Sequence, residues 1–146
     1  MIIRPYQSAD ESTVISLWKA CNLLVPWNNP YQDIVRKQGT DAELFMVAEL
    51  DSQVRATIMV GYDGHRGWIN YLAVHPEYRR RGVAKQLLRG AESHLCQKGC
   101  PKLNLQIRSS NPDAVAFYQA MGYVEDDVVS FGKRLVADEP YDINEC

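Results

Sequence analysis

The sequence has no hydrophobic run that approaches the roughly 18 consecutive apolar residues of a membrane span. Its first residues also lack the basic stretch followed by an apolar segment that marks a secretory leader. Neither sign of charge predominates, since 16 Lys and Arg stand against 18 Asp and Glu for a formal net charge of −2. The chain therefore lacks the diffuse positive field of a nonspecific nucleic-acid binder. We expect a cytoplasmic protein that binds neither membrane nor nucleic acid.

Cysteine is scarce and poorly placed for a metal site or a disulfide framework. The four cysteines form no Cys-x-x-Cys pair, and no histidine lies at metal-ligand spacing from them. We expect no metal, and we interpret these residues as packed or surface thiols in a reducing compartment. They are Cys21, Cys96, Cys100 and Cys146.

No internal repeat, low-complexity run or linker rich in Gly, Ser or Pro divides the 146 residues. The composition, 46% hydrophobic and 23% charged, is that of an ordinary globular chain. A chain of this length has room for one core, which buries about two-thirds of the surface of the unfolded chain. We expect residues 1–146 to form a single domain.

Apolar residues recur with helical or strand periodicity along the chain. A capping box at Ser8 and Glu11 and Asn-Pro pairs at 29–30 and 111–112 predict three helix starts. The elements expected in chain order are a strand at 2–6, helices after residue 8 and at 30–37, strands at 44–50, 54–62 and 68–74, a helix at 82–97, a strand at 103–107, a helix after residue 111 and one or two strands within 124–136. This order predicts a mixed α/β (α+β) fold, with a mostly antiparallel sheet of six to seven strands flanked by about four helices.

The clearest chemical signal lies where the strand at 68–74 runs into the helix at 82–97. A helix start that carries Gly82 gathers unpaired N–H groups at the positive end of a helix dipole, which favours an anion site. The arginines at 79–81 add local positive charge. A solvated basic run before a helix is the simpler interpretation. The glycine spacing matches neither Gly-x-Gly-x-x-Gly nor the Walker pattern, so a dinucleotide or ATP site is disfavoured.

Arg79-x-x-Gly82-x-Ala84 resembles the [Q/R]-x-x-G-x-[G/A] signature of the GNAT superfamily of N-acetyltransferases. The context is similar too: a preceding strand that ends in LAVHPEYR, a following amphipathic helix, and a later segment, NPDAVAFYQAMGY, that looks like the second cofactor-contacting motif of that family. The resemblance extends over nearly the whole chain, although the first 40 residues match by element order more than by residue type. It implies acetyl-CoA as the cosubstrate and an acetyl group transferred to a primary amine.

The resemblance also implies where the cofactor binds. In the family, the strand before the signature carries a bulge that splays it from the next strand, and its backbone pairs with the pantetheine arm. The amides of the signature loop bind the pyrophosphate. The cofactor-binding residues implied in this sequence are Leu72, Ala73, Val74, Arg79, Arg80, Arg81, Gly82, Val83, Ala84, Asn111 and Tyr118.

Tyr118 is the expected catalytic residue. It lies seven residues after Asn111 and so on the same helix face, and a phenol can donate a proton to a departing thiolate. Core packing of a helical aromatic residue is the alternative interpretation. The resemblance implies direct attack by a neutral amine on the acetyl carbonyl, with no covalent acyl-enzyme.

The base that removes the amine proton stays open. Members of the family that acetylate protein N-termini use a glutamate on the fifth strand, whereas the aligned residue here is Gln106, which cannot accept a proton. The candidate bases are Glu49, Asp33, His65 and Asp63.

The acceptor site in this fold is usually shaped by the first two helices and the loop between them. Trp27, Asn28, Tyr31 and Asp33 are therefore candidates for a wall that suits a cationic amine, and Glu49 is a further candidate substrate-binding residue. A small molecule and a protein both stay open as acceptors, because a protein acceptor needs an open groove between the second helix and the last strands. A catalytically weak acyl-CoA-binding sensor is the alternative function, and a nucleic-acid-binding domain is a remote third. A monomer and a homodimer are both compatible with the sequence.

Overall fold

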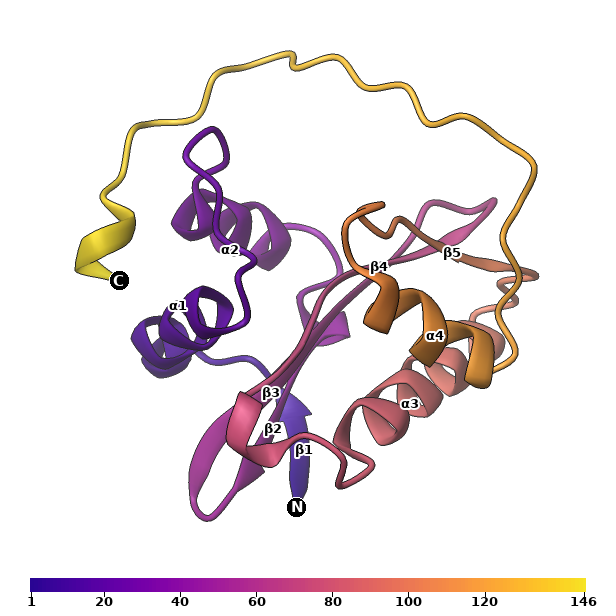
Figure 1. The fold of residues 1–146 in the computed structure, drawn as a ribbon, viewed down its shortest axis with the longest axis horizontal. Helices are drawn as coiled ribbons and strands as arrows, with labels where there is room; N and C mark the ends of the chain where they lie inside the picture. The colour runs from indigo at the N-terminus through magenta and orange to yellow at the C-terminus, as the bar shows by residue number, and fades with distance from the viewer.

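The computed structural model describes residues 1–146 and contains five strands and four helices (Figure 1). The strands are β1 (Ile2–Pro5), β2 (Phe45–Leu50), β3 (Gln53–Tyr62), β4 (Gly67–Val74) and β5 (Leu103–Leu105). The helices are α1 (Glu11–Ala20), α2 (Pro30–Gln38), α3 (Val83–Gln97) and α4 (Pro112–Ala120), with short 3-10 turns η1 (Ser8–Asp10), η2 (Ala42–Leu44), η3 (Pro76–Tyr78) and η4 (Ile143–Glu145). None of the helices has the length and apolar character needed to cross a bilayer.

The five strands form one sheet in the order β1-β2-β3-β4-β5. Strands β1 to β4 pair antiparallel, and the two hairpins expected among β2, β3 and β4 are confirmed. Strand β5 pairs parallel to β4, because α3 carries the chain back along the sheet between them. The mixed sheet flanked by four helices is confirmed, but the expected count of six to seven strands is wrong.

The missing strands are those expected within residues 124–136, which form no regular structure. Their apolar side chains are exposed, Phe131 at 92%. A strand needs a neighbour to satisfy its backbone hydrogen bonds, and the edge strand β5 offers only three residues. The tail instead crosses to the other side of the molecule and ends in η4 beside α1 and α2 (Figure 1).

Asn-Pro pairs start two of the helices, as the sequence predicts. Asn29 caps α2 by accepting a hydrogen bond from the Tyr31 amide at 2.9 Å. Asn111 caps α4 by accepting from the Ala114 amide at 3.1 Å. In both helices the proline stands at the first position, where its missing N–H leaves no bond unmade.

The capping box at the first helix lies one residue earlier than expected. The Gln7 amide donates to Asp10 Oδ2 at 2.8 Å, and the 3-10 turn η1 precedes α1. Two hydrogen bonds from the Arg4 guanidinium, at 2.8 and 2.9 Å, fix the Asp10 carboxylate in this position. The pair at Ser8 and Glu11 is therefore a wrong prediction, because an ion pair with β1 selects Asp10 instead.

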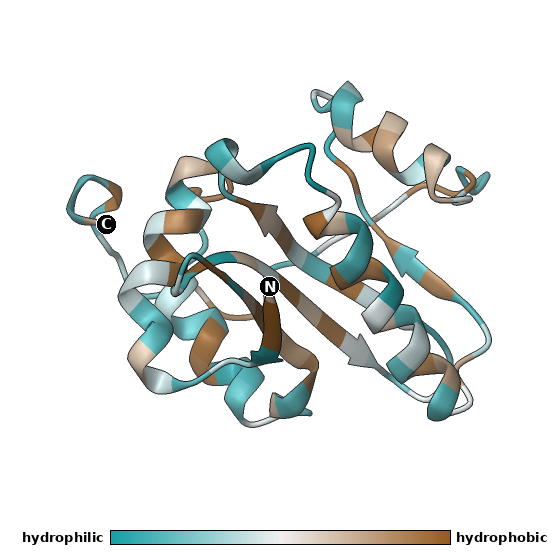
Figure 2. Cartoon of the chain, turned by 90° about the horizontal axis from the view of Figure 1, so that it is seen from below, coloured by the Kyte–Doolittle hydropathy of each residue, from teal (hydrophilic) through white to brown (hydrophobic).

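The sheet has a hydrophobic core on each face. Helices α3 and α4 cover one face and bury Leu87 and Leu88, while α1 and α2 cover the other and bury Trp18 and Ile34. Figure 1 shows the two helix pairs on opposite sides of the strands, and in Figure 2 hydrophobic residues concentrate on the central strands. Complete burial of a side chain such as Leu88 contributes roughly 1.5–3 kcal/mol to stability.

Strand β4 carries a bulge at Tyr71 and Leu72, where two of its residues face one residue of β3. Tyr71 has a φ of 51°, in the left-handed region that few residues other than glycine adopt. The fully buried Thr57 hydroxyl donates to the Tyr71 carbonyl at 2.8 Å and accepts from the Trp18 indole N–H at 2.9 Å. Helix α1 therefore supports the bulge through Thr57.

Strand β5 pairs with β4 only at the start of β4. Their register runs from Gly67 to Ile69 on β4, and residues 70–74 have no strand on that side. The His75 amide donates to the Arg55 carbonyl at 2.8 Å, so the adjacent Val74 occupies a non-hydrogen-bonded position and its N–H and C=O point away from β3. The splay expected at this strand end is thus present.

Candidate active site

Helix α3 begins with an open N-terminus. Its N-cap is Gly82, which has a φ of 76°, and neither a capping side chain nor an acidic residue occupies the first turn. The amides of Val83, Ala84 and Lys85 donate to no acceptor within the protein. These N–H groups stand at the positive end of a 15-residue helix, an arrangement that attracts an anion.

Three arginines precede this helix start. The Arg79 Nε–H donates to the Val74 carbonyl at 3.0 Å, and the Arg81 guanidinium lies 4.9 Å from the centre of the Tyr78 ring. Arg80 is exposed and has a φ of 64°. None of the three forms an ion pair with a carboxylate. Their charge is therefore available to a ligand.

The residues of this loop fit the pyrophosphate of acetyl-CoA. A Cβ built on Gly82 would meet no atom within 4 Å, so the outer side of the backbone there is open. Unpaired amides beside unpaired arginines are the donors that phosphate groups require. The structure brings the sequence-predicted residues 79–84 together in one loop and helix start.

Residues 72–74 lie along the splay. Ala73 is buried in the core beneath α1 and α2, whereas Leu72 and Val74 pack against the core beneath α3 and α4. The Val74 carbonyl accepts from Arg79 and, at 3.3 Å, from Cys21 Sγ. The strand end and the arginine loop are thus joined directly.

Tyr118 lies on α4 within the core beneath α3 and is 9% exposed. Its ring packs edge-on against Phe117 and Tyr123, with ring centroids 5.1 and 5.5 Å away. Its hydroxyl makes no hydrogen bond within the protein and is not fully buried, so it contacts solvent. Burial of the ring raises the pKa of Tyr118 to about 12, which keeps the phenol protonated at neutral pH.

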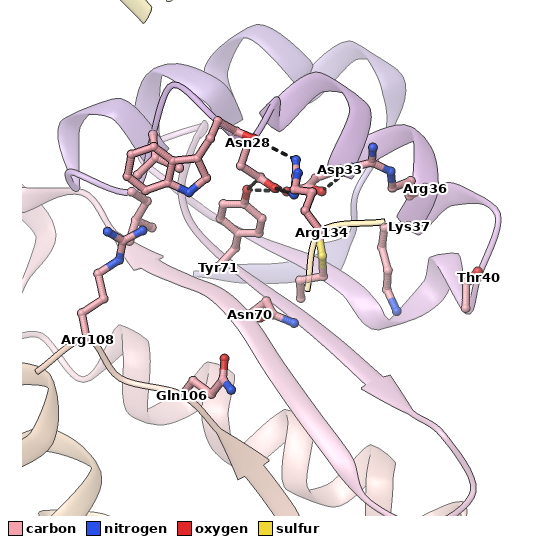
Figure 3. A pocket seen from close by; sticks show the side chains of 14 residues that line it. Asn28, Asp33, Arg36, Lys37, Thr40, Asn70, Tyr71, Gln106, Arg108 and Arg134 are labelled. Carbon is pink, nitrogen blue, oxygen red and sulfur yellow. Dashed lines mark hydrogen bonds and ion pairs between the residues drawn. The ribbon is translucent and has the colours of Figure 1, made fainter. Parts of the chain in front are cut away.

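A pocket of about 720 Å³ lies on the α1 and α2 side of the splay (Figure 3). This volume is typical of a small-molecule site. Asn70 and Tyr71 line it at the bulge of β4, and Gln106 lines it just beyond β5, so the pocket reaches the gap between these strands. The other lining residues are Leu23, Val25, Trp27, Asn28, Asp33, Arg36, Lys37, Thr40, Met59, Arg108 and Arg134.

Asp33 supplies the only carboxylate that lines this pocket. Its Oδ2 accepts from the Tyr71 hydroxyl at 2.7 Å and from the Asn28 amide, and its Oδ1 accepts from Arg36 at 3.0 Å. Burial, together with the hydrogen bond to Asp33, raises the pKa of Tyr71, so that hydroxyl remains a donor. Three donors therefore fix the Asp33 carboxylate in place.

The pocket contains some of the predicted acceptor residues and leaves out others. Those that line it are Trp27, Asn28 and Asp33. Tyr31 packs instead against Tyr141, with 6.5 Å between ring centroids. Glu49 accepts from Arg4 at 3.5 Å, at the pairing of β1 with β2.

The two candidate bases in the β3–β4 turn also lie outside the pocket. Asp63 Oδ1 accepts from the amides of Arg66 and His65 at 2.7 and 2.8 Å, and these bonds hold the pKa of Asp63 below its usual range. His65 is exposed in the same turn. Gln106 does line the pocket, and its amide donates to the Ser130 hydroxyl.

Four cationic residues of the pocket were not anticipated from the sequence: Arg36, Lys37, Arg108 and Arg134. Lys37 lies four residues after Asp33 on α2, a spacing that places both on one helix face. Arg108 lies two residues after Gln106, and in an extended segment residues at this spacing lie on the same side. No local signal indicates Arg134, because the path of the tail depends on distant contacts.

Comparisons with known proteins agree with this geometry. The model of the acetyltransferase (GNAT) family matches residues 12–123. Among solved structures, Ard1 from Thermoplasma volcanium superposes with a TM-score of 0.75 at 23% identity, over 84% of this chain and 82% of that one. An aminoglycoside antibiotic 6'-N-acetyltransferase from Acinetobacter haemolyticus gives 0.70 at 25% identity, over 93% and 100%. The PaiA N-acetyltransferase from Thermoplasma acidophilum, in complex with coenzyme A, gives 0.68 at 21%, over 88% and 92%.

The fold, the open helix start and the splay define an enzyme that transfers an acyl group. The family match covers well over half of the chain, and the protein belongs to the acetyltransferase (GNAT) family. Its cosubstrate is acetyl-CoA.

Proposed function

We propose that this protein transfers the acetyl group of acetyl-CoA to a primary amine. The observation that carries the proposal is the splay between β4 and β5. The open start of α3 follows the end of β4, and the pocket reaches the same gap from the α1 and α2 side (Figures 1 and 3). An enzyme that holds two reactants at one point lowers the barrier to their reaction by removing the entropy of their encounter.

Residues on the α3 side are assigned to the cosubstrate, which when bound supplies an activated acetyl thioester. The free amides at the start of α3 and the arginines at 79–81 bind its phosphates. Asn111, at the start of α4, also binds the cosubstrate, and the backbone of residues 72–74 binds the pantetheine arm. The Leu72 amide polarises the acetyl carbonyl.

The transfer is proposed to be direct. The lone pair of a neutral amine forms a C–N bond to the acetyl carbon, and the C–S bond breaks. Tyr118 hydrogen-bonds to the departing sulfur and gives it a proton. A phenol with a pKa of about 12 is a weaker acid than a thiol with a pKa of about 8.5, so the phenolate then regains a proton at once from solvent. The products are an amide and a thiol, and one proton leaves the amine.

Asp33 is proposed to receive that proton through a water, because it is the one candidate base that lines the pocket. Its three hydrogen-bond donors also favour a second candidate function. With its oxygens already accepting three hydrogen bonds, Asp33 has little access for a further proton donor, which suits a protein that binds acyl-CoA as a sensor and turns it over slowly.

We further propose that residues 1–146 act as one acetyltransferase domain in the cytoplasm. Both hydrophobic cores share the one sheet, which supports a single folding unit. All four cysteines are free, which supports a reducing compartment.

The test is thiol release from acetyl-CoA with a panel of primary amines, by wild type and by Tyr118→Phe. We expect the variant to lose about 10²-fold or more in kcat and to retain its affinity for acetyl-CoA. Its stability should hold, since the hydroxyl has no partner in the protein.

Tyr123→Phe is the matched control, because this neighbouring hydroxyl donates to Glu92 at 2.9 Å and has no assigned role in the reaction. Equal kcat for wild type and Tyr118→Phe would exclude Tyr118 as the proton donor. Wild type that binds acetyl-CoA and acetylates no amine would support the sensor.

A further inference from the structure

The pocket is lined by more positive charge than suits a simple cationic amine as the acceptor. Its lining contains one carboxylate, Asp33, and four cationic residues. The cations are Arg36, Lys37, Arg108 and Arg134. A positively charged amine entering this pocket meets net repulsion, whereas a negative group meets attraction.

Two carboxylates neutralise two of these cations. Arg36 pairs with Asp33 at 3.0 Å and with Asp138, and Arg134 pairs with Asp138 at 2.8 Å. The Asp138 side chain is only 3% exposed, and the Arg36 guanidinium and the Asn29 amide lower the pKa of Asp138 to about 2, so it is ionised at neutral pH. These groups form a closed network that has no charge left over.

Lys37 and Arg108 have no carboxylate partner. Lys37 is buried and donates to the Val60 carbonyl, and burial lowers the pKa of Lys37. Arg108 differs, because a guanidinium stays charged at any physiological pH. Its side chain makes no hydrogen bond within the protein and lines the pocket two residues beyond Gln106 (Figure 3). Arg108 is therefore a permanent charge of the pocket that neither a carboxylate nor a hydrogen bond within the protein engages.

The tail is bonded to the loop beside the pocket and contributes Arg134 to its lining. The Arg134 guanidinium donates to the Trp27 carbonyl at 2.8 Å and to Asn28 Oδ1 at 3.4 Å. The Asn29 amide donates to Asp138 Oδ2 at 2.8 Å. These bonds tie the tail to the loop between α1 and α2, which itself lines the pocket. A volume of about 720 Å³ suits a small molecule.

We propose that the acceptor is a small amine that also carries a carboxylate or phosphate group, and that Arg108 binds this group. The inference rests on the proposed acetyl transfer and deepens it. The planar guanidinium offers paired N–H donors that match either anion. With the anion held at Arg108, the amine end of the acceptor lies toward Gln106 and Asn70, where the pocket meets the splay. Polycations such as an aminoglycoside are poor acceptors on this account.

The first test compares acceptors that differ only in the anionic group. The probes are β-alanine against β-alaninamide, and phosphoethanolamine against ethanolamine, with spermidine and kanamycin as polycations. The readout is kcat/KM for thiol release by the full chain. We expect kcat/KM for β-alanine, for phosphoethanolamine or for both to exceed that for the matching neutral amine at least about 10-fold. The reason is that hydrogen bonds to a charged group are stronger than those between neutral groups. Which of the two is preferred identifies the anion.

The second test removes the guanidinium with Arg108→Gln. We expect KM for the anionic acceptor to rise about 10- to 100-fold, with kcat/KM for its neutral partner and the affinity for acetyl-CoA unchanged. Arg66→Gln is the control, because that arginine lies in the β3–β4 turn and its guanidinium hydrogen-bonds only to His65.

The outcomes separate this inference from the proposed function. If kcat/KM for neutral or polycationic acceptors equals that for anionic ones, the inference is overturned and acetyl transfer is left intact. An unchanged KM in Arg108→Gln would also overturn it. Acetyl-CoA binding with no acceptor turned over would overturn both.

Discussion

The Tyr71 hydroxyl donates a hydrogen bond to Asp33 Oδ2 at 2.7 Å and thereby ties the bulge of β4 to α2. Tyr71 holds a left-handed φ, and its ring stacks on Trp18 with 3.7 Å between centroids. One side chain thus connects the acceptor pocket to the strand end that leads into the arginine loop. A backbone conformation this uncommon persists only where its surroundings hold it.

Tyr71→Phe keeps the ring and removes this bond. We expect the free energy of unfolding to fall by about 1–3 kcal/mol, because Asp33 loses a partially buried donor. The acceptor KM should rise as Asp33 and the bulge become less fixed. Urea unfolding and steady-state kinetics measure the two effects. Tyr62→Phe is the control, since its exposed hydroxyl bonds only to the Gly64 carbonyl at 3.3 Å. Identical behaviour of the two variants would show that the Tyr71 bond is not supporting the site.

Gly82→Ala tests the open start of α3. Its Cβ would meet no atom, so the substitution acts through the left-handed φ of 76° and should cost about 1–2 kcal/mol of stability. Acetyl-CoA affinity should fall as the backbone relaxes and the free amides turn. Gly90→Ala lies within the same helix, also with open space at its Cβ, and should stabilise the protein by about 0.5–1 kcal/mol. Unchanged stability and affinity in Gly82→Ala would contradict the assigned role of this loop.

The ion pair between Asp10 and Arg4 makes stability depend on pH. The hydrogen bonds from Arg4, assisted by the Gln7 amide, hold the pKa of Asp10 below its usual range. As the pH falls, the unfolded state therefore takes up this proton first, so the stabilisation is complete above about pH 4 and is lost below it. Urea unfolding between about pH 6 and pH 3 should show this loss, and Asp10→Asn should reduce it. A variant as sensitive to acid as wild type would assign the effect to other carboxylates.

Most elements could be predicted because their signals are local. The Asn-Pro pairs at 29–30 and 111–112 start α2 and α4 in the structure, and the turn at Asp63 and Gly64 joins β3 to β4. The prediction of the last strands was wrong for a nonlocal reason. Residues 124–136 have strand-like composition, but the bonds of the following segment go to the loop before α2 and not to the sheet edge.

Only one side of the candidate site, the one that carries the sequence motifs, could be predicted from the sequence. The arginine loop and Tyr118 belong to motifs that are contiguous in the sequence, so the resemblance predicts a cosubstrate side, and the open start of α3 is found at the expected loop. The acceptor side is assembled from α2, β4, the end of β5 and the tail. Arg108 and Arg134 line the same pocket as Asp33 only in the folded chain, and for that reason a wall suited to a cationic amine was expected where the lining has net positive charge.

Isothermal titration of the full chain with acetyl-CoA tests the central claim most directly, because every assignment at the splay depends on it. The account predicts a micromolar Kd, equivalent to about −8 kcal/mol, that weakens as salt rises because arginines bind phosphates. Absence of binding up to about 1 mM, in a sample that circular dichroism shows to be folded, would contradict it.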